Sequence, residues 1–298
     1  GTGDAIPRPL EFELRQDYND YFKHIVMSSW NTDVYLKVGD INLSRSGNFM
    51  QEEAPELLDL KILKGSKNGL KEVNSIMLSE TLAKDLFGDK DPIGEPINVN
   101  SEGDFMVPAV YEDIHEGNSF SDLQYLANWE MIVQTYEWMK NSVDQWSNNS
   151  FQMFVQIHEN SDMQSVSDII KDVKKEASAE TREFNPQLLL HPMKDWYLRS
   201  DFEDGKQTGG RISNVWMFGV IGVFVLLLAC INFINLSTAR SEKRAIEVGI
   251  RKSIGSQRSQ LIFQFLSESF VVVVLAFILA IGLVLLFFKL FKSFNLLI

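Results

Sequence analysis

The sequence predicts an α+β domain of mixed strands and helices in two lobes, followed by transmembrane α-helices. Residues 215–236 and 270–288 form runs of 22 and 19 residues without a charged side chain. At a helical rise of about 1.5 Å per residue, each run can cross a hydrocarbon core of about 30 Å. The more than two hundred residues before them contain no comparable run. A water-soluble domain attached to a membrane by its carboxyl-terminal part is therefore expected.

The first elements expected in the soluble domain are a β-hairpin and a short helix. Apolar and polar residues alternate over 34–38, the period of a half-buried strand, and Gly39-Asp40 predicts a hairpin turn after it. A helix is predicted to begin at Ser79, to bury four apolar side chains and to end at Gly88. Residues 91–99 combine an Asp-Pro-Ile-Gly turn with a short strand.

A second strand and a longer helix are expected further along the domain. Residues 151–157 alternate in the strand period. Ser161 and Gln164 predict a capping box that opens a helix. Its apolar residues fall on one face: Met163, Val166, Ile169, Ile170, Val173 and Ala177. The Asp/Glu/Gly/Lys stretch 201–210 predicts a hinge before the first membrane helix.

Charge predicts the orientation in the membrane. Residues 1–211 hold 20 Lys and Arg against 37 Asp and Glu, a net charge of −17. Residues 237–261 hold six basic and two acidic residues, a net charge of +4. Short basic loops stay in the cytoplasm, whereas long domains are translocated largely regardless of charge. The turn is therefore expected inside and residues 1–211 outside, and the acidic excess argues against binding to nucleic acid.

The single cysteine and the two ends of the sequence give two further expectations, one on disulfides and one on the length of the whole protein. Cys230 is the only cysteine and lies in the first apolar run, so no internal disulfide can form. The chain begins without Met or a signal-peptide pattern and ends ten residues after the second run. Because a translocated domain needs an export signal, we expect a piece of a longer protein with an earlier membrane helix.

Motifs for catalysis are absent from the sequence. No Gly-x-x-x-x-Gly-Lys-Ser/Thr phosphate loop or Gly-x-Ser-x-Gly nucleophile motif is present. The acidic pairs Glu52-Glu53 and Glu112-Asp113 are ordinary in an acidic domain. Four histidines are scattered without the spacing of metal ligands: His24, His115, His158 and His191. We therefore predict no catalytic residue, no metal and no cofactor.

The basic segment 237–261 carries the most informative pattern. Ile246, Ile250 and Ile254 recur every fourth residue and form an apolar stripe, with charged residues on a neighbouring face. Gly255 predicts a left-handed end to this short helix, and Ser256 a cap for the next one. Two explanations are equally compatible with the pattern: an interfacial helix that anchors the loop to anionic lipid, and a helix that docks on a cytoplasmic partner.

The membrane runs contain small and polar residues with two interpretations each. Asn232 and Asn235 lie one turn apart near the cytoplasmic end. They can bond water or headgroups, or they can bond another helix. Ala276 and Ala280 form a small-xxx-small pair that would let a helix approach closely, although Ala is also a common filler.

Several stretches resemble one family. They are Ile231-Asn-Phe-Ile-Asn-Leu-Ser-Thr-Ala-Arg-Ser, Arg244-Ala-Ile-Glu-Val-Gly-Ile-Arg-Lys-Ser-Ile-Gly-Ser and Gln264-Phe-Leu-Ser-Glu-Ser, with Ser79 to Gly94 and Pro192 to Leu198 upstream. Together they resemble MacB/FtsX-like ABC transporter permeases, in the version common in Bacteroidota. Such a permease has a membrane helix before residue 1 and at least one after residue 298, so the chain would hold the second and third helices.

The resemblance implies two domains. Residues 1–211 would be the extracytoplasmic MacB-like core domain. Residues 212–298 would be the FtsX-like membrane module, with a helix over 212–236, a cytoplasmic coupling segment over 237–261 and a helix over 262–288. The location implied is the inner (plasma) membrane of a bacterium.

The resemblance also implies partners and a mechanism. A separate cytoplasmic ABC ATPase subunit would hydrolyse ATP, and a second permease copy or half, membrane lipid and a periplasmic protein would be the other partners. The coupling helix would seat on the ATPase through Glu242, Lys243, Arg244, Ile246, Glu247, Gly249, Ile250, Arg251 and Lys252. Its motion would reach the outer domain for export or for regulation of a periplasmic partner. The cargo is not identified by these motifs.

A membrane-bound sensor with an extracytoplasmic ligand-binding domain is the rival interpretation. A sensor is expected to place a kinase, cyclase or coiled-coil output after its membrane helix. This chain returns to the membrane after about twenty-five residues, 237–261, which favours the permease.

Overall fold

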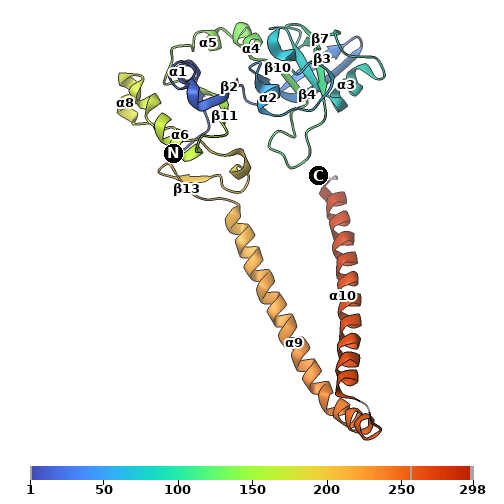
Figure 1. Ribbon diagram of the computed structural model, residues 1–298. Coiled ribbons are helices and arrows are strands. Elements are labelled where there is room, and N and C mark those ends of the chain that lie inside the picture. Colours follow the sequence, from blue (N-terminus) through green and yellow to red (C-terminus); the bar gives the residue numbers. More distant parts are fainter. Residues whose placement is uncertain (1, 256, 296–298) are drawn as a thin grey trace. The chain divides into compact units, whose positions relative to one another are not determined.

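The protein is described from a computed structural model, which describes residues 2–255 and 257–295; the side chains of 240–244, 247, 258 and 291–295 lie outside the described set. The chain divides into two compact units, Gly1–Val215 and Trp216–Ile298. Figure 1 shows that the first unit combines strands with short helices, whereas two long helices, α9 and α10, make up the rest. The predicted fold class, a mixed α+β domain followed by long apolar helices, is confirmed.

An 11-stranded mixed sheet organises the first unit. Its main path runs β1-β11-β2-β4-β10-β6-β9-β5, and β3, β7 and β8 continue from β4 as a side branch. Two of the pairings are parallel, β10 with β4 and β6 with β9. The strands are β1 (Ile6–Pro7), β2 (Phe22–Ser28), β3 (Thr32–Val38), β4 (Ile41–Met50), β5 (Ile62–Gly65), β6 (Ile76–Ser79), β7 (Pro96–Val99), β8 (Gly103–Met106), β9 (Ala109–Tyr111), β10 (Tyr125–Asn128) and β11 (Asn149–Ile157).

The β-strands expected from alternation are confirmed. β3 and β4 form an antiparallel hairpin in which Val38 lies opposite Ile41, and Gly39 turns the chain with φ +57°. β11 covers the strand expected over 151–157. The turn expected over 91–94 leads into β7, with Gly94 at φ +78°. These elements follow local signals, so short-range pattern sufficed to find them.

Short helices cover the sheet. They are α1 (Pro9–Asp17), α2 (Ala54–Leu57), α3 (Glu80–Phe87), α4 (Trp129–Thr135), α5 (Glu137–Lys140), α6 (Met163–Ile170), α7 (Val173–Glu176) and α8 (Ala179–Phe184), with 3₁₀ turns η1 (Asn19–Tyr21), η2 (Gly69–Lys71) and η3 (Met193–Asp195). α3 confirms its prediction, because the Ser79 side chain caps the amide of Leu82 and Gly88 ends the helix at φ +60°.

The helix expected after Ser161 differs from its prediction. Asp162 is the N-cap of α6, and its carboxylate accepts from the amide of Ser165 at 2.9 Å. Both Ser and Asp are good caps, and the sequence alone does not choose between adjacent ones. The helix stops at Ile170 and resumes as α7. Of the expected apolar face, Val166, Ile170 and Val173 are buried and Ile169 is exposed.

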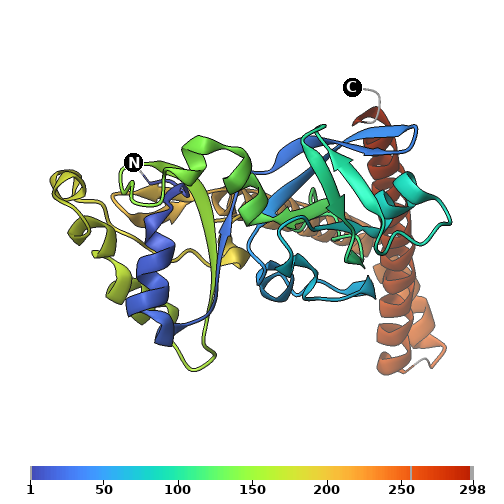
Figure 2. The same ribbon diagram turned by 90° about the horizontal axis from the view of Figure 1, so that it is seen from above.

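Figure 2 shows the first unit as two halves, which we call the helical lobe and the sheet lobe, and each holds buried apolar residues. In the helical lobe, α1, α6 and α7 pack on β2 and β11. In the sheet lobe, α3 packs among β3, β6, β7 and β10. β2 and β4 join the lobes at the pair Ser28 and Met50. Beside this pair Asn48 accepts hydrogen bonds from the hydroxyls of Ser28 and Ser29 at 2.9 Å, so buried polar atoms there are satisfied.

The stretch expected to be a hinge is a second, small sheet. β12 (Asp201–Glu203) and β13 (Lys206–Gly209) form an antiparallel hairpin. Asp204 and Gly205 at its tip have φ +50° and +73°. An Asp-Gly pair at two positive φ values is the preferred two-residue hairpin turn. The polar composition of 201–210 thus reflects a tight turn, and the role of this stretch as a hinge stays a prediction.

The two long helices are α9 (Ile212–Ser253) and α10 (Arg258–Asn295). Each contains a stretch long and apolar enough to cross a membrane, Ile212–Ala239 and Ser259–Leu290. The short helix expected within 237–261 is not separate, since α9 continues through the membrane run to Ser253. No proline interrupts 237–253, and a lone Gly249 costs only about 1 kcal/mol in a helix, so nothing breaks the hydrogen-bond ladder.

Gly47 offers a test of the contact between β4 and β10. A Cβ at this position would lie 2.3 Å from Tyr125 Cδ1 and 2.4 Å from the Tyr125 carbonyl oxygen. Because Tyr125 is fully buried, it cannot move aside cheaply. We predict that Gly47→Ala lowers the melting temperature of the detergent-solubilised chain by about 5–10 °C.

The matched control is Gly103→Ala, also in a strand. Its Cβ would meet only Met131 Cε, at an ordinary contact distance of 3.8 Å. Circular dichroism melts of both variants give the comparison. Equal melting temperatures for the two variants would contradict the close contact between Gly47 and Tyr125.

Candidate functional site

The end of α9 presents an exposed apolar surface. Ile246 and Ile250, one turn apart, retain 70% and 57% of their side-chain exposure. Between them Gly249 is open, since a Cβ there would meet nothing within 4 Å. We call Ile246, Gly249 and Ile250 the docking face. Ile254, which the sequence adds to the same stripe, is exposed but follows the last residue of α9.

The connection between α9 and α10 is short and well capped. Gly255 has φ +96°, the left-handed conformation predicted for it, and its amide donates to the Lys252 carbonyl at 3.2 Å. Ser256, predicted to cap the next helix, lies outside the described residues. The described cap of α10 is the amide of Gln257, which donates to Gln260 Oε1 at 3.2 Å. These bonds satisfy some of the backbone groups that the two helix ends leave open.

A side-chain hydrogen bond spans the turn. Arg251 Nη1, in the last turn of α9, donates to Gln264 Oε1 on α10 at 2.6 Å. Leu261, between them along the chain, is buried with 8% exposure, and Val248 is half-buried. Val248 and Arg251 therefore lie on the side of α9 that faces the turn, whereas Ile246 and Ile250 face away.

The structure separates the residues predicted for the coupling helix. Ile246, Gly249 and Ile250 come together on the docking face, Arg251 contacts Gln264, and Lys252 is exposed on another side of the helix. The side chains of the remaining four lie outside the described residues: Glu242, Lys243, Arg244 and Glu247. Their backbone belongs to α9, and their role stays a prediction.

The residues proposed for helix packing are all exposed. Asn232 and Asn235 on α9 and Ala276 and Ala280 on α10 lie in the two candidate spans, neither of which is buried by other parts of the described chain. No contact of theirs with another helix is seen within the described residues. The choice between helix packing and lipid contact at these positions therefore stays open.

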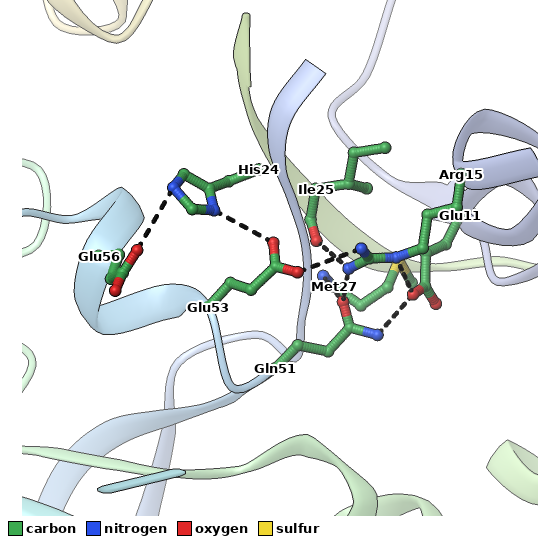
Figure 3. A network of polar contacts seen from close by, with 8 residues as sticks. All are labelled: Glu11, Arg15, His24, Ile25, Met27, Gln51, Glu53 and Glu56. Atoms are coloured by element: carbon green, nitrogen blue, oxygen red, sulfur yellow. Dashed lines mark hydrogen bonds and ion pairs between the residues drawn. The ribbon is translucent and has the colours of Figure 1, made fainter. Parts of the chain in front are cut away.

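A polar network in the first unit joins residues that are far apart in the sequence (Figure 3). Arg15 on α1 is its centre. Its Nε donates to Glu11 Oε1 at 2.9 Å, and its Nη1 donates to Glu53 Oε1 at 3.3 Å. Its Nη2 donates to the Ile25 carbonyl and to Gln51 Oε1. Arg15 thereby fastens α1 to β2 and to the residues that follow β4.

His24 extends this network on the other side of β2. Its Nδ1 lies 3.3 Å from Glu53 Oε2, and its Nε2 lies 3.6 Å from Glu56 Oε2 (Figure 3). The donors of Arg15 are matched with carboxylate, amide and carbonyl acceptors, which is typical of a structural network. Within residues 2–255 and 257–295, no group of histidine, cysteine and carboxylate side chains is arranged to hold a metal ion.

The acidic pair Glu112-Asp113 also has structural partners. Glu112 forms an ion pair with Lys61 at 2.7 Å. Asp113 accepts from the amide of Thr81 at 3.1 Å, in the first turn of α3. Partial burial acts to raise the pKa of Asp113, but hydrogen bonds from Thr81 and Ser79 outweigh it and lower that pKa below its usual value. A carboxylate that stays ionised at a helix start stabilises the helix.

Two domain families account for most of the chain. The MacB-like periplasmic core domain matches residues 2–173, more than half of the sequence. The FtsX-like permease C-terminal domain matches residues 219–298. The chain belongs to the MacB/FtsX-like permease family. Members of this family are membrane permeases with a periplasmic domain, in agreement with the two candidate spans here.

Two relatives show how much of a full-length permease is present. The ABC transporter permease YknZ of Bacillus subtilis (strain 168) is 26% identical over 254 residues, 84% of this chain and 54% of the relative. The macrolide export ATP-binding/permease protein MacB of Bdellovibrio bacteriovorus is 24% identical over 213 residues, 70% of this chain and 30% of the relative. The chain thus spans about half or less of the length of these relatives.

Two solved structures align with more than half of the chain. The periplasmic region of MacB from Actinobacillus actinomycetemcomitans aligns with a TM-score of 0.44 and 14% identity, over 58% of this chain and 76% of that structure. A permease domain from Porphyromonas gingivalis aligns with a TM-score of 0.47 and 13% identity, over 59% and 80%.

Sequence reasoning on this MacB/FtsX-like permease missed the partners of several residues. The contact of Arg251 with Gln264 crosses from one helix to the next, and the contacts of Arg15 cross from α1 to residues 51–53. In the sequence, the available signal for this contact was that Arg251 and Gln264 each belong to one of the family motifs on either side of the turn. Pairing them required the geometry of the turn.

The contact across the turn can be tested by cross-linking in a Cys230→Ser background. We predict that a short bismaleimide joins Arg251→Cys to Gln264→Cys, because the two wild-type side chains meet at 2.6 Å. The control pair, Ile250→Cys with Gln264→Cys, should react far less, since Ile250 faces away from α10. Mass spectrometry of the peptides measures both yields. Equal yields would show that the turn is not closed as described.

Proposed function

We propose that this chain is the permease part of an ABC transporter, in which a separate cytoplasmic ATPase moves the membrane helices and these move the extracytoplasmic domain. The observation that carries the proposal is the continuity of α9. Its 42 residues run without a break from the first unit, through a candidate span, to the docking face. At about 1.5 Å per residue this helix is about 63 Å long, enough to connect the two sides of a membrane.

The docking face supports contact with a protein. Two exposed isoleucines flank an open glycine, where a partner backbone can approach closely. Apolar anchors surrounded by charge are typical of specific docking surfaces. The segment also carries a net charge of +4, which would attract an acidic cleft of the ATPase and would hold the turn near anionic lipid.

The direction of transport and the other partners belong to the same proposal. The basic turn is expected in the cytoplasm of a bacterial cell and the acidic residues 1–211 outside its inner membrane. Exposed apolar side chains along α9 and α10 leave room for a second permease copy or half. Neither apolar run carries a charged residue that would line a path for a polar cargo. Export or regulation is therefore proposed to take place at the outer domain, with a periplasmic protein as a further partner.

Docking on the ATPase is tested by two changes on the docking face. Ile250→Asp places a charge in the apolar contact, and Gly249→Leu fills the open position without disturbing the chain itself. We predict that each lowers retention of the ATPase on permease-containing membranes by about tenfold or more, equal to about 1.4 kcal/mol. Membrane insertion should be unchanged.

The matched control for Ile250→Asp is Ile41→Asp, which changes an exposed isoleucine at the β3–β4 hairpin. This variant should retain the ATPase fully. If Ile250→Asp and Gly249→Leu retain it as well, docking through α9 is wrong, and a membrane-bound sensor becomes the better account of the chain.

Orientation is tested with single cysteines in a Cys230→Ser background. Ser121→Cys in the first unit and Ser253→Cys at the end of α9 should react with an impermeant maleimide from opposite sides of the membrane. The basic turn keeps Ser253 in the cytoplasm, while the core domain is translocated. Intact cells should therefore label Ser121→Cys alone, and inverted vesicles Ser253→Cys alone. Labelling of both from the same side would reverse the topology.

A further inference from the structure

An aromatic cluster lies where the core of the first unit approaches its carboxyl end. Trp196 follows η3, and its ring lies 5.9 Å from the ring of Phe120 and 5.7 Å from that of Phe154, between centroids. Phe120 and Phe154 are themselves 5.4 Å apart, edge to face. Phe154 belongs to β11 and packs in the buried core. Aromatic contacts of this kind contribute about 0.5–1.5 kcal/mol each beyond their burial.

Hydrogen bonds fix the orientation of Trp196. Its indole Nε1 donates to the His191 carbonyl at 3.1 Å, and its backbone amide donates to the Met193 carbonyl at 3.3 Å. The His191 ring packs edge-on against Phe202 of β12 at 5.1 Å. Burial lowers the pKa of His191, opposed by Asp195, which favours the neutral imidazole. The two hydrogen bonds of Trp196 therefore orient its indole ring toward the segment 191–193.

Two residues after Trp196, the chain is bonded to the start of α9. The Leu198 carbonyl accepts from the amide of Ile212, the first residue of α9, at 2.9 Å. This bond satisfies one of the amides that a helix start leaves open. The guanidinium of Arg211 lies 4.5 Å above the ring of Tyr197, a cation–π contact. Backbone and side chain thus join the same two segments.

Gly210 brings these segments into backbone contact. Its φ is +131°, and a Cβ there would lie 2.7 Å from the Leu198 carbonyl oxygen and 2.8 Å from the Ser200 amide. No side chain fits this position without moving the backbone. Because the backbones of Leu198 and Gly210 are in contact, the β12–β13 hairpin between them projects to one side. The connection from Leu198 to the start of α9 is therefore direct and does not run through the hairpin.

We propose that Trp196 is a positioning residue that locks α9 to the core of the first unit. Ring contacts connect Phe154 and Phe120 to Trp196. Two residues later, a backbone hydrogen bond connects Leu198 to Ile212. Movement of the helix then turns the whole domain instead of being absorbed in the connecting segment. The role of the lock in transmitting motion rests on the proposed function, whereas the rigidity of the lock does not. The role and the rigidity can therefore be tested separately.

Rigidity is measured by electron-spin distance measurements on the full chain in nanodiscs, without ATPase or nucleotide. Nitroxide labels are placed at Lys84→Cys on α3 and Asn214→Cys in the first turn of α9, in a Cys230→Ser background. We expect a narrow distance distribution in the parent and a width that roughly doubles in Trp196→Ala, because the aromatic contacts are lost. Trp196→Phe, which keeps a ring, should restore most of the narrow distribution.

The matched control is Trp138→Ala, which removes a half-exposed tryptophan stacked on Phe151 of β11. This variant should keep the narrow distribution. An unchanged width in Trp196→Ala, or equal broadening in Trp138→Ala, would overturn the lock.

Gly210→Ala tests the same lock without touching the aromatic cluster. If Trp196→Ala does not fold, as judged by its circular dichroism melt, the distance distribution of Gly210→Ala tests the lock in its place. Broadening in Gly210→Ala supports the lock, and a parent-like width overturns it.

A second experiment separates the lock from the proposed function. In the assembled transporter, Trp196→Ala should bind the ATPase and hydrolyse ATP like the parent. It should lose the nucleotide-dependent change in maleimide reactivity at Lys84→Cys. A preserved nucleotide response in Trp196→Ala overturns the lock's role. If the ATPase never binds the parent, the proposed function fails, and the distance widths still decide whether the lock exists.

Discussion

An unbroken ladder of backbone hydrogen bonds along α9 is the constraint on which the rest of the structure depends. Inside a bilayer an unpaired amide or carbonyl costs several kcal/mol, so residues 212–239 must be helical whatever their side chains. Beyond the hydrocarbon that requirement ends, yet the helix continues to Ser253. The membrane thus imposes a rigid element, and residues 240–253 extend it beyond the span at one end.

Both ends of this helix are hydrogen-bonded to neighbouring segments of the chain. At its start, Ile212 is bonded to Leu198, which follows the anchored Trp196. At its end, Arg251 is bonded to Gln264 on α10. A stiff rod between two flexible joints would transmit little motion, because displacement at one end would be absorbed at the joints. Under the proposed function, stiff joints at both ends would let α9 transmit motion along its length.

Local patterns predicted much of the fold and little of the long-range contact. The β3–β4 hairpin, α3 and both apolar runs follow from turn residues, caps and composition within ten to thirty residues. The prediction of Ser161 as the helix cap was wrong because Ser161 and Asp162 are adjacent good caps, and the hairpin in 201–210 was not predicted. The family motifs led to the coupling segment, but the partners of Arg251 and Trp196 are contacts in space, which a single sequence does not encode as pattern.

The helical period explains how one helix end can hold the turn and present a docking face together. Residues 246 and 250 share one side of α9, and residues 248 and 251 share another, about 150° away at 3.6 residues per turn. The first pair is exposed and the second is half-buried toward the turn. A partner can therefore bind the isoleucines without displacing Arg251 from Gln264. Under the proposed function, a push on the docking face would therefore act on both α9 and α10 at once.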